Sequence, residues 1–165
     1  MSTMKDAMAC FATGVTVVTT YFDNQLWGMT CNSFNTVSLD PAMVLWSIRK
    51  QSSSHHAFTQ ARGYTINILS ADQQDVAMRF TKGTQAERFD ALPLTLLSGQ
   101  RARLTHALAW FDCELDNTVQ AGDHDILIGR VIEFGLHPQP AADALVYVNR
   151  QFGVLQIPSE ELHHG

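Results

Sequence analysis

Residues 27–54 read WGMTCNSFNTVSLDPAMVLWSIRKQSSS, and the expected fold is built outward from this stretch. It begins as a strand that carries four small polar residues in a row, at positions 30–33. After a turn at Asp40-Pro41, the apolar run from Ala42 to Trp46 predicts a further strand. That strand leads into a hydroxyl, two cations and a serine cluster, which are Ser47, Arg49, Lys50 and Ser52–Ser54.

The serine cluster stands where a short helix over residues 55–58 is expected, because serine is a favoured residue at a helix start. Free backbone N–H groups attract an anion at such a position, and Arg49 or Lys50 would neutralise a phosphate. A capped helix beside two solvated charges explains the same residues. The pattern alone leaves both interpretations open.

The polar quartet at 30–33 also has two interpretations. Its side chains and backbone would offer donors and acceptors to a planar polar ring. An exposed polar edge strand accounts equally well for four such residues inside an otherwise good strand.

The segment Gly122-Asp123-His124 lies between two long expected strands. It is typical of a hairpin turn with a local aspartate hydrogen bond. Alternatively, it places His124 at the mouth of a barrel, where an imidazole would position a substrate. No metal site is expected, because the adjacent histidine pairs 55–56 and 163–164 do not converge on one ion.

The rest of the chain predicts a mainly β protein with a few short helices. Alternating or β-branched runs predict strands at 15–22, 26–33, 43–48, 64–69, 108–120, 125–136, 145–148 and 152–157. Helices are expected at 5–11, 55–58 and 70–80, and residues 81–105 read as a long ordered loop. Without a βαβ alternation, this order favours a closed or nearly closed antiparallel barrel.

Composition narrows the function class. The 165 residues carry a net charge of −5, which argues against nucleic-acid or anionic-membrane partners. No apolar run reaches the length of a membrane span. We expect a single domain over 1–165 with a polar tail at 158–165. Three cysteines and no signal peptide indicate reduced thiols and a cytoplasmic protein.

Three blocks of sequence resemble the short-chain flavin reductases, the reductase components of two-component flavin-dependent monooxygenases. The first is GMTCNSFNTVSLDP at 28–41. The second is AWFDCE at 109–114 followed by AGDH at 121–124, and the third is FATGV at 11–15. The resemblance extends over residues 5–157.

The resemblance implies an FMN-binding split β-barrel that reduces FMN or FAD with NADH or NADPH. It also implies a homodimer with flavin near the interface and a separate oxygenase that receives the reduced flavin. By position, the ring would contact Thr30, Cys31, Asn32 and Ser33. The phosphate or ribityl chain would contact Ser47, Arg49, Ser53 and Ser54. The long loop would contribute Phe80, Arg88 and Phe89, and His124 would be the catalytic-site residue that meets the nicotinamide.

Two alternatives share the expected architecture. One is a flavin-binding protein that stores or senses the cofactor without catalysis. The other resembles pyridoxamine-phosphate oxidase, with FMN held tightly, and would need a second basic pocket for which only Arg101 and Arg103 are available. The segment 149–152 (NRQF) replaces a glycine-containing turn of the family, which leaves the choice between NADH and NADPH open.

Overall fold

The computed structural model of the chain describes residues 1–139 and 143–158. The expected polar tail lies outside the described residues from position 159 onward, as does the His163–His164 pair. Within the described parts, no helix is long and apolar enough to cross a membrane.

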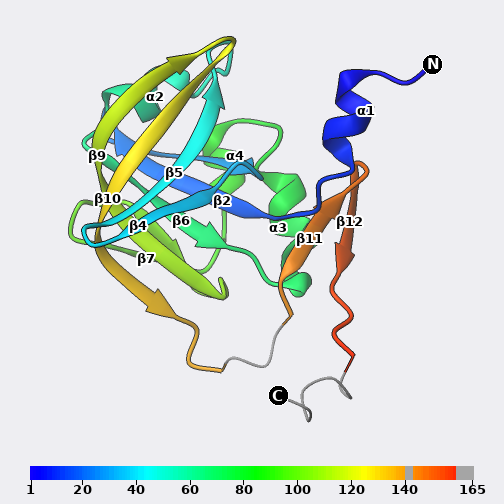
Figure 1. Cartoon of the computed structure of the whole chain (residues 1–165). Coiled ribbons are helices and arrows are strands. Elements are labelled where there is room, and N and C mark those ends of the chain that lie inside the picture. The colour runs from blue at the N-terminus through cyan, green and yellow to red at the C-terminus, as the bar shows by residue number, and fades with distance from the viewer. Residues whose placement is uncertain (140–142, 159–165) are drawn as a thin grey trace.

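Seven antiparallel strands form the main sheet, in the order β3-β2-β6-β9-β10-β5-β4 (Figure 1). This confirms the expectation of an antiparallel barrel with few helices. The strand bounds are β2 (Thr16–Phe22), β3 (Gln25–Cys31), β4 (Asn35–Leu39), β5 (Ala42–Arg49), β6 (Gly63–Ile68), β9 (Ala109–Ala121) and β10 (His124–Leu136).

The two edge strands, β3 and β4, follow each other in the chain and are joined through residues 32–34. In this connection, the Ser33 hydroxyl accepts a hydrogen bond from Ser47 N at 2.9 Å and donates one to Ser47 O at 3.1 Å. The Ser33 side chain thereby adds one more pair of hydrogen bonds to β5 beyond the end of β4. These bonds bring the two edge strands, β3 and β4, together. The expected strand over 26–33 is therefore wrong at its end, because the chain leaves β3 at Cys31.

An arm projects from the barrel on one side (Figure 1). It holds a second sheet in the order β1-β11-β12, together with the N-terminal helix. The helix is tied to the β11–β12 turn by the Arg150–Asp6 ion pair at 3.0 Å and by Asn149 N, which donates to Ala9 O. The bounds are α1 (Met4–Ala9), β1 (Thr13–Gly14), β11 (Leu145–Val148) and β12 (Gln151–Val154), so the last strand is shorter than expected.

The segment 81–105 was expected to be a long ordered loop without helices or strands, and this expectation is wrong in part. It contains one short helix and a two-stranded ladder, and a turn of helix precedes it. The hydroxyl of Thr19 donates to Ala102 O at 2.7 Å, and Asn67 Oδ1 accepts from Leu104 N at 2.8 Å. These buried bonds fix the ladder to the barrel wall. The elements are η1 (Ala71–Gln73), α3 (Gln74–Arg79), α4 (Gln85–Phe89), β7 (Leu94–Leu96) and β8 (Ala102–Leu104).

Alternation along β5 decides which residues face the site. Val44, Trp46 and Ile48 are buried in the barrel core, where Trp46 meets Phe58 of α2 (His55–Gln60) edge-on. Side chains alternate across a strand. Ser47 and Arg49 therefore lie on the opposite face of β5 from the core.

A buried ion pair anchors the 81–105 segment to β9. Arg101 Nε donates to Asp112 Oδ1 at 2.7 Å and Arg101 Nη2 donates to Asp112 Oδ2 at 3.2 Å. The Thr65 hydroxyl donates to the same carboxylate at 2.8 Å. Asp112 is fully buried, so this carboxylate depends on its partners for the interactions that water would otherwise supply.

Asp112→Ala is expected to lower the free energy of unfolding by about 3–5 kcal/mol, because it leaves the Arg101 charge buried and unpaired. Urea unfolding followed by tryptophan fluorescence measures the change. The matched control is Arg130→Ala, which removes an exposed pair with Glu114 and should cost less than about 1 kcal/mol. Equal effects of the two substitutions would contradict the anchoring role.

Candidate functional site

A cavity of about 500 Å³ brings together many of the residues expected to bind a phosphate. Its walls come from β3, the end of β5, the loop before α2, the end of α3 and the helix α4. It is lined by Met29, Thr30, Arg49, Gln51, Ser52, Ser53, Ser54, Phe80, Thr81 and Arg88. Of the residues predicted for the phosphate or ribityl chain, only Ser47 is not part of this wall.

Two arginines approach this cavity from different walls. Arg49 is exposed at the end of β5. Arg88 is buried, and it donates from Nε to Lys82 O at 3.0 Å and from Nη1 to Gly28 O at 2.7 Å. Burial lowers the pKa of the Arg88 guanidinium, but arginine stays protonated in proteins. Two fixed positive charges at one cavity suit an anionic group.

The serine cluster is arranged differently from a simple helix cap. Ser54 occupies the N-cap position of α2, but its hydroxyl makes no capping hydrogen bond. Instead, Ser54 Oγ accepts from Gln85 Nε2 at 3.2 Å, and Ser54 N donates to Ser52 Oγ at 3.2 Å. The expectation of a serine hydroxyl that caps this helix is therefore wrong, and Ser54 instead lines the cavity.

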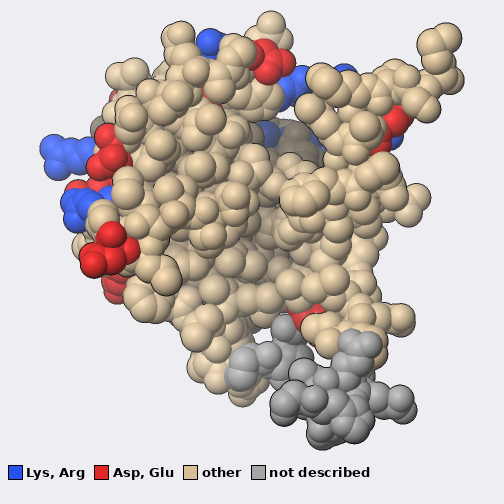
Figure 2. Space-filling view, in the orientation of Figure 1, with Lys and Arg blue, Asp and Glu red and all other residues tan. Residues whose placement is uncertain are grey.

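A second cavity of about 410 Å³ adjoins the first, since both are lined by Thr30 and Thr81. It lies between β3 and the projecting arm, and the molecule is visibly hollowed there (Figure 2). Its walls are mostly apolar, with Tyr147 and Phe152 in ring contact at 5.2 Å between centroids. Val15, Cys31, Asn32, Met78 and Arg150 complete its lining.

The four polar residues at positions 30–33 have different hydrogen-bond partners and different exposure. The Thr30 hydroxyl donates to Ala77 O at 2.6 Å, and Cys31 Sγ lies 3.2 Å from the Thr16 hydroxyl. Burial raises the pKa of the Cys31 thiol, so it is protonated at neutral pH. With Ser33 engaged in closing the barrel, Asn32 is the one member whose side chain is exposed.

The segment from α3 to α4 covers the free edge of β3. Thr30 N donates to Phe80 O at 3.3 Å, and Gly28 N donates to Gln85 Oε1 at 2.8 Å. A Cβ at Gly28 would lie 2.5 Å from the Phe80 ring, so glycine permits this close approach. Phe80 and Phe89 pack edge-on, with 5.0 Å between their ring centroids, in an apolar cluster separate from the one around Trp46. Of the two, only Phe80 also lines a cavity of the site.

His124 is the first residue of β10, directly opposite Arg49 of β5 in the ladder. Its Nδ1 lies 2.7 Å from Asp123 Oδ1, and this hydrogen bond lowers the pKa of the Asp123 carboxyl. Asp123 O also accepts from Lys50 N at 2.9 Å. The hairpin tip is thus fixed at the end of β5 that carries Arg49, although His124 lines neither cavity.

Two long-range contacts around the site were not predicted from the sequence. Gln85 links β3 to Ser54, and His55 Nε2 lies 2.6 Å from Asp125 Oδ2. The second contact ties the start of α2 to β10. A histidine and an aspartate 70 positions apart give no local signal, and a glutamine in an irregular segment gives none either.

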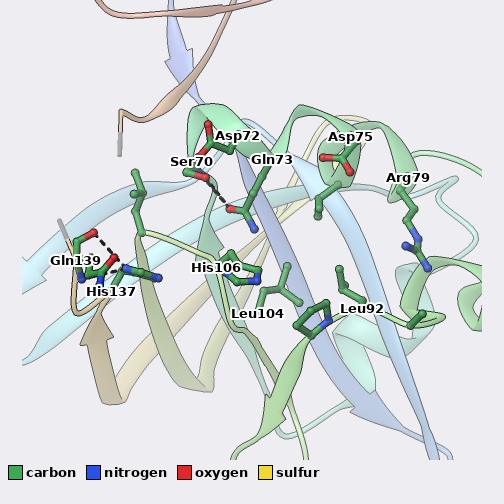
Figure 3. Close-up of a pocket in the computed structure, with 14 residues that line it drawn as sticks. Ser70, Asp72, Gln73, Asp75, Arg79, Leu92, Leu104, His106, His137 and Gln139 are labelled. Atoms are coloured by element: carbon green, nitrogen blue, oxygen red, sulfur yellow. Dashed lines mark hydrogen bonds between the residues drawn. The ribbon is translucent and has the colours of Figure 1, made fainter. Parts of the chain in front are cut away.

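A separate cavity of about 640 Å³ lies below α3 and contains none of the predicted site residues (Figure 3). His106 points into it beneath Gln73, while His137 and Gln139 close one end. Among the residues that the structure describes, no group of three or more histidine, cysteine or carboxylate side chains is arranged to hold a metal ion.

Comparisons with known proteins find relatives that are named as flavin reductases or as reductase components. The chain is 46% identical over 132 residues to the reductase component of a flavin-dependent trigonelline monooxygenase from Acinetobacter baylyi, covering 79% of this chain and 42% of that protein. It is 43% identical to the FMN reductase (NADH) SmoA of Agrobacterium fabrum over 78% of this chain and 72% of that protein. The chain therefore spans less than half the length of the first of these relatives.

A solved structure has the same architecture. The NADH:FAD oxidoreductase SgcE6 of Streptomyces globisporus, in complex with NAD and FAD fragments, superimposes with a TM-score of 0.86 at 29% identity. The match covers 94% of this chain and 92% of that one. The profile of the flavin reductase like domain matches residues 8–156. This chain belongs to the flavin reductase like domain family.

Proposed function

We propose that this protein is an NAD(P)H-dependent flavin reductase that supplies reduced flavin to a separate oxygenase. One observation carries the proposal: a cavity lined by two arginines and three serines adjoins a mostly apolar cavity at Thr30 and Thr81. FMN and FAD combine a phosphate-bearing chain with a flat ring, and the paired cavities match those two parts in chemistry.

The residues present fit the flavin. Arg49, Arg88 and Ser52–Ser54 would hold its phosphate, while the apolar wall with Tyr147 and Phe152 would shield its ring. When bound, the flavin supplies the redox chemistry by accepting a hydride from a reduced nicotinamide. The protein's part is to hold both molecules in place and to exclude water.

This chemistry requires no nucleophile from the protein. The buried Cys31 thiol stays protonated, because burial raises its pKa. His124 belongs to the AGDH block that resembles the family, and on that resemblance we assign it to the nicotinamide as a positioning group. In the structure it lies opposite Arg49 and lines neither cavity. Its contact with Asp123 fixes the orientation of the imidazole ring.

The names of the relatives support NADH as the donor and an oxygenase as the recipient. SmoA is named as an FMN reductase (NADH), and the Acinetobacter relative is named as a monooxygenase reductase component. We extend both descriptions to this chain. The cytoplasm is the proposed compartment, which agrees with three free cysteines at positions 10, 31 and 113.

We further propose that the protein is a homodimer. An apolar groove of about 460 Å³ runs across β4, β5 and β10, with Val37, Leu39 and Phe134 in its walls. The side chain of Leu39 is 96% exposed and that of Phe134 is 68% exposed. The face of the molecule in Figure 2 carries most of its charged residues near the left edge and the top. Exposed apolar side chains that line a groove are typical of a surface that a second subunit covers.

Arg101 and Arg103, the two arginines available for a second basic pocket, do not support the resemblance to pyridoxamine-phosphate oxidase. Arg101 is neutralised by Asp112 in the interior, and Arg103 lies over the Trp110 ring at 5.2 Å. Neither arginine lines the two cavities of the site. These side chains stabilise the fold instead of forming an open basic pocket.

Arg49→Ala is expected to weaken FMN binding about tenfold, the magnitude of one hydrogen bond to a charged group. Riboflavin has no phosphate, so its affinity should change little. Quenching of flavin fluorescence measures both. Lys50→Ala is the control, since Lys50 is exposed and does not line the cavity. If the ratio of FMN affinity to riboflavin affinity is unchanged, Arg49 does not bind the phosphate.

The purified protein is expected to oxidise NADH when FMN or FAD is added, and His124→Ala should raise the KM for NADH by roughly three- to tenfold. The KM for flavin should stay near its original value. The loss of NADH absorbance at 340 nm follows the reaction. His106→Ala, in the separate cavity, serves as the control. Flavin binding without NADH oxidation would favour the storage protein.

Phe134→Glu is expected to shift the protein from dimer to monomer, because it places a charge in the apolar groove. Sedimentation velocity gives the mass in solution. Leu96→Glu alters an exposed apolar residue outside that groove and should leave the mass unchanged. A monomeric original protein would refute the dimer.

A further inference from the structure

Gln85 is the first residue of α4, and its side chain lies between the edge of β3 and the phosphate end of the site. Its Oε1 accepts from Gly28 N at 2.8 Å, and its Nε2 donates to Ser54 Oγ at 3.2 Å. Gln85 itself does not line the cavity, whereas Ser54 does. It therefore contacts a predicted ligand of the phosphate from behind.

The orientation of this amide follows from chemistry. A backbone N–H can only donate, so the atom facing Gly28 must be the amide oxygen. The NH₂ group must then face Ser54, whose hydroxyl oxygen acts as the acceptor. A serine hydroxyl has one proton to donate, and Ser54 donates it to no other group among the described residues.

We propose that Gln85 is a positioning residue, which holds the Ser54 hydroxyl with its proton directed to the phosphate of the flavin. Ser54 is 2% exposed, so water does not compete freely for this hydroxyl. The inference rests on the proposed function, in which the cavity with Arg49 and Arg88 takes a phosphate. The proposal adds Gln85, which contacts the expected ligand Ser54 from outside the cavity, and it specifies that the Ser54 hydroxyl donates toward the phosphate.

Gln85→Glu reverses the polarity of this contact with almost no change in shape. A carboxylate still accepts from Gly28 N, so the cover of the β3 edge is kept. Facing Ser54, however, the carboxylate would accept a hydrogen bond from the hydroxyl, which turns its proton away from the phosphate, and it would place a negative charge nearby. Gln85→Met is the neutral counterpart, because it fills similar space without any donor.

Binding of FMN and of riboflavin to these variants tests the proposal. We expect Gln85→Glu to weaken FMN binding more than tenfold and Gln85→Met to weaken it several-fold, with riboflavin changed less than about twofold. In a Ser54→Ala background, Gln85→Met should add no further loss. Fluorescence titration gives the affinities, and thermal unfolding shows whether each variant remains folded.

Equal losses for FMN and riboflavin in Gln85→Glu would reduce Gln85 to a structural contact and overturn the proposal. So would a loss from Gln85→Met that persists in the Ser54→Ala background. The Arg49→Ala variant distinguishes a failure of the Gln85 proposal from a failure of the proposed function. If Arg49→Ala lowers FMN relative to riboflavin and Gln85→Glu does not, only the role of Gln85 is wrong. If neither does, the phosphate assignment fails as well.

Discussion

The free edge of β3 is the constraint on which the site depends. An edge strand exposes backbone N–H and C=O groups that must find partners. Here Phe80 O, the Gln85 amide and the Arg88 guanidinium supply them to Thr30 and Gly28. The contacts that complete the fold also bring an arginine and a glutamine to the serine cluster. Fold and ligand site are therefore built from the same hydrogen bonds.

Pairing in the main sheet places the remaining site groups. The alternation of β5 directs Trp46 into the core and Arg49 away from it. Register then sets His124 of β10 opposite Arg49, and Asp125 next to it reaches His55 at the start of α2. A shift of one residue in this register would send Arg49 into the core and remove the positive charge from the cavity.

Long, β-branched strands were predictable because each carries its own pattern. The runs in β2, β6, β9 and β10 are of this kind, and the structure has a strand at each. The elements β7, β8 and α4 are three to five residues long, too short for a periodicity to show. The strand β4 was not predicted, because three of its five residues are polar and it is followed at once by a turn.

The site itself was predictable only as far as residue type allows. The sequence marked the serines, Arg49 and His124, but strand alternation and barrel closure divide the polar quartet in ways that spacing does not reveal. Gln85 and Gly28 are 57 positions apart, and their contact exists only because β3 is an edge. A side chain that hydrogen-bonds to the backbone of a strand distant in the sequence leaves no local pattern by which the contact could be predicted.

Both cavities have walls that are tied to the barrel. The cavity that we assign to the phosphate is bounded by β5, α2 and the β3 edge, all tied to the barrel by backbone and buried side-chain bonds. The second cavity is bounded on one side by the arm. Leu145 N in the arm donates to Leu69 O, and Leu69 N donates to Val15 O. Tyr147 and Phe152 pack on the same buried apolar cluster as Leu69 and Leu145, so the arm is a firm wall too. A flavin bound by its phosphate in the first cavity would therefore have its ring against a wall that the fold already holds in place.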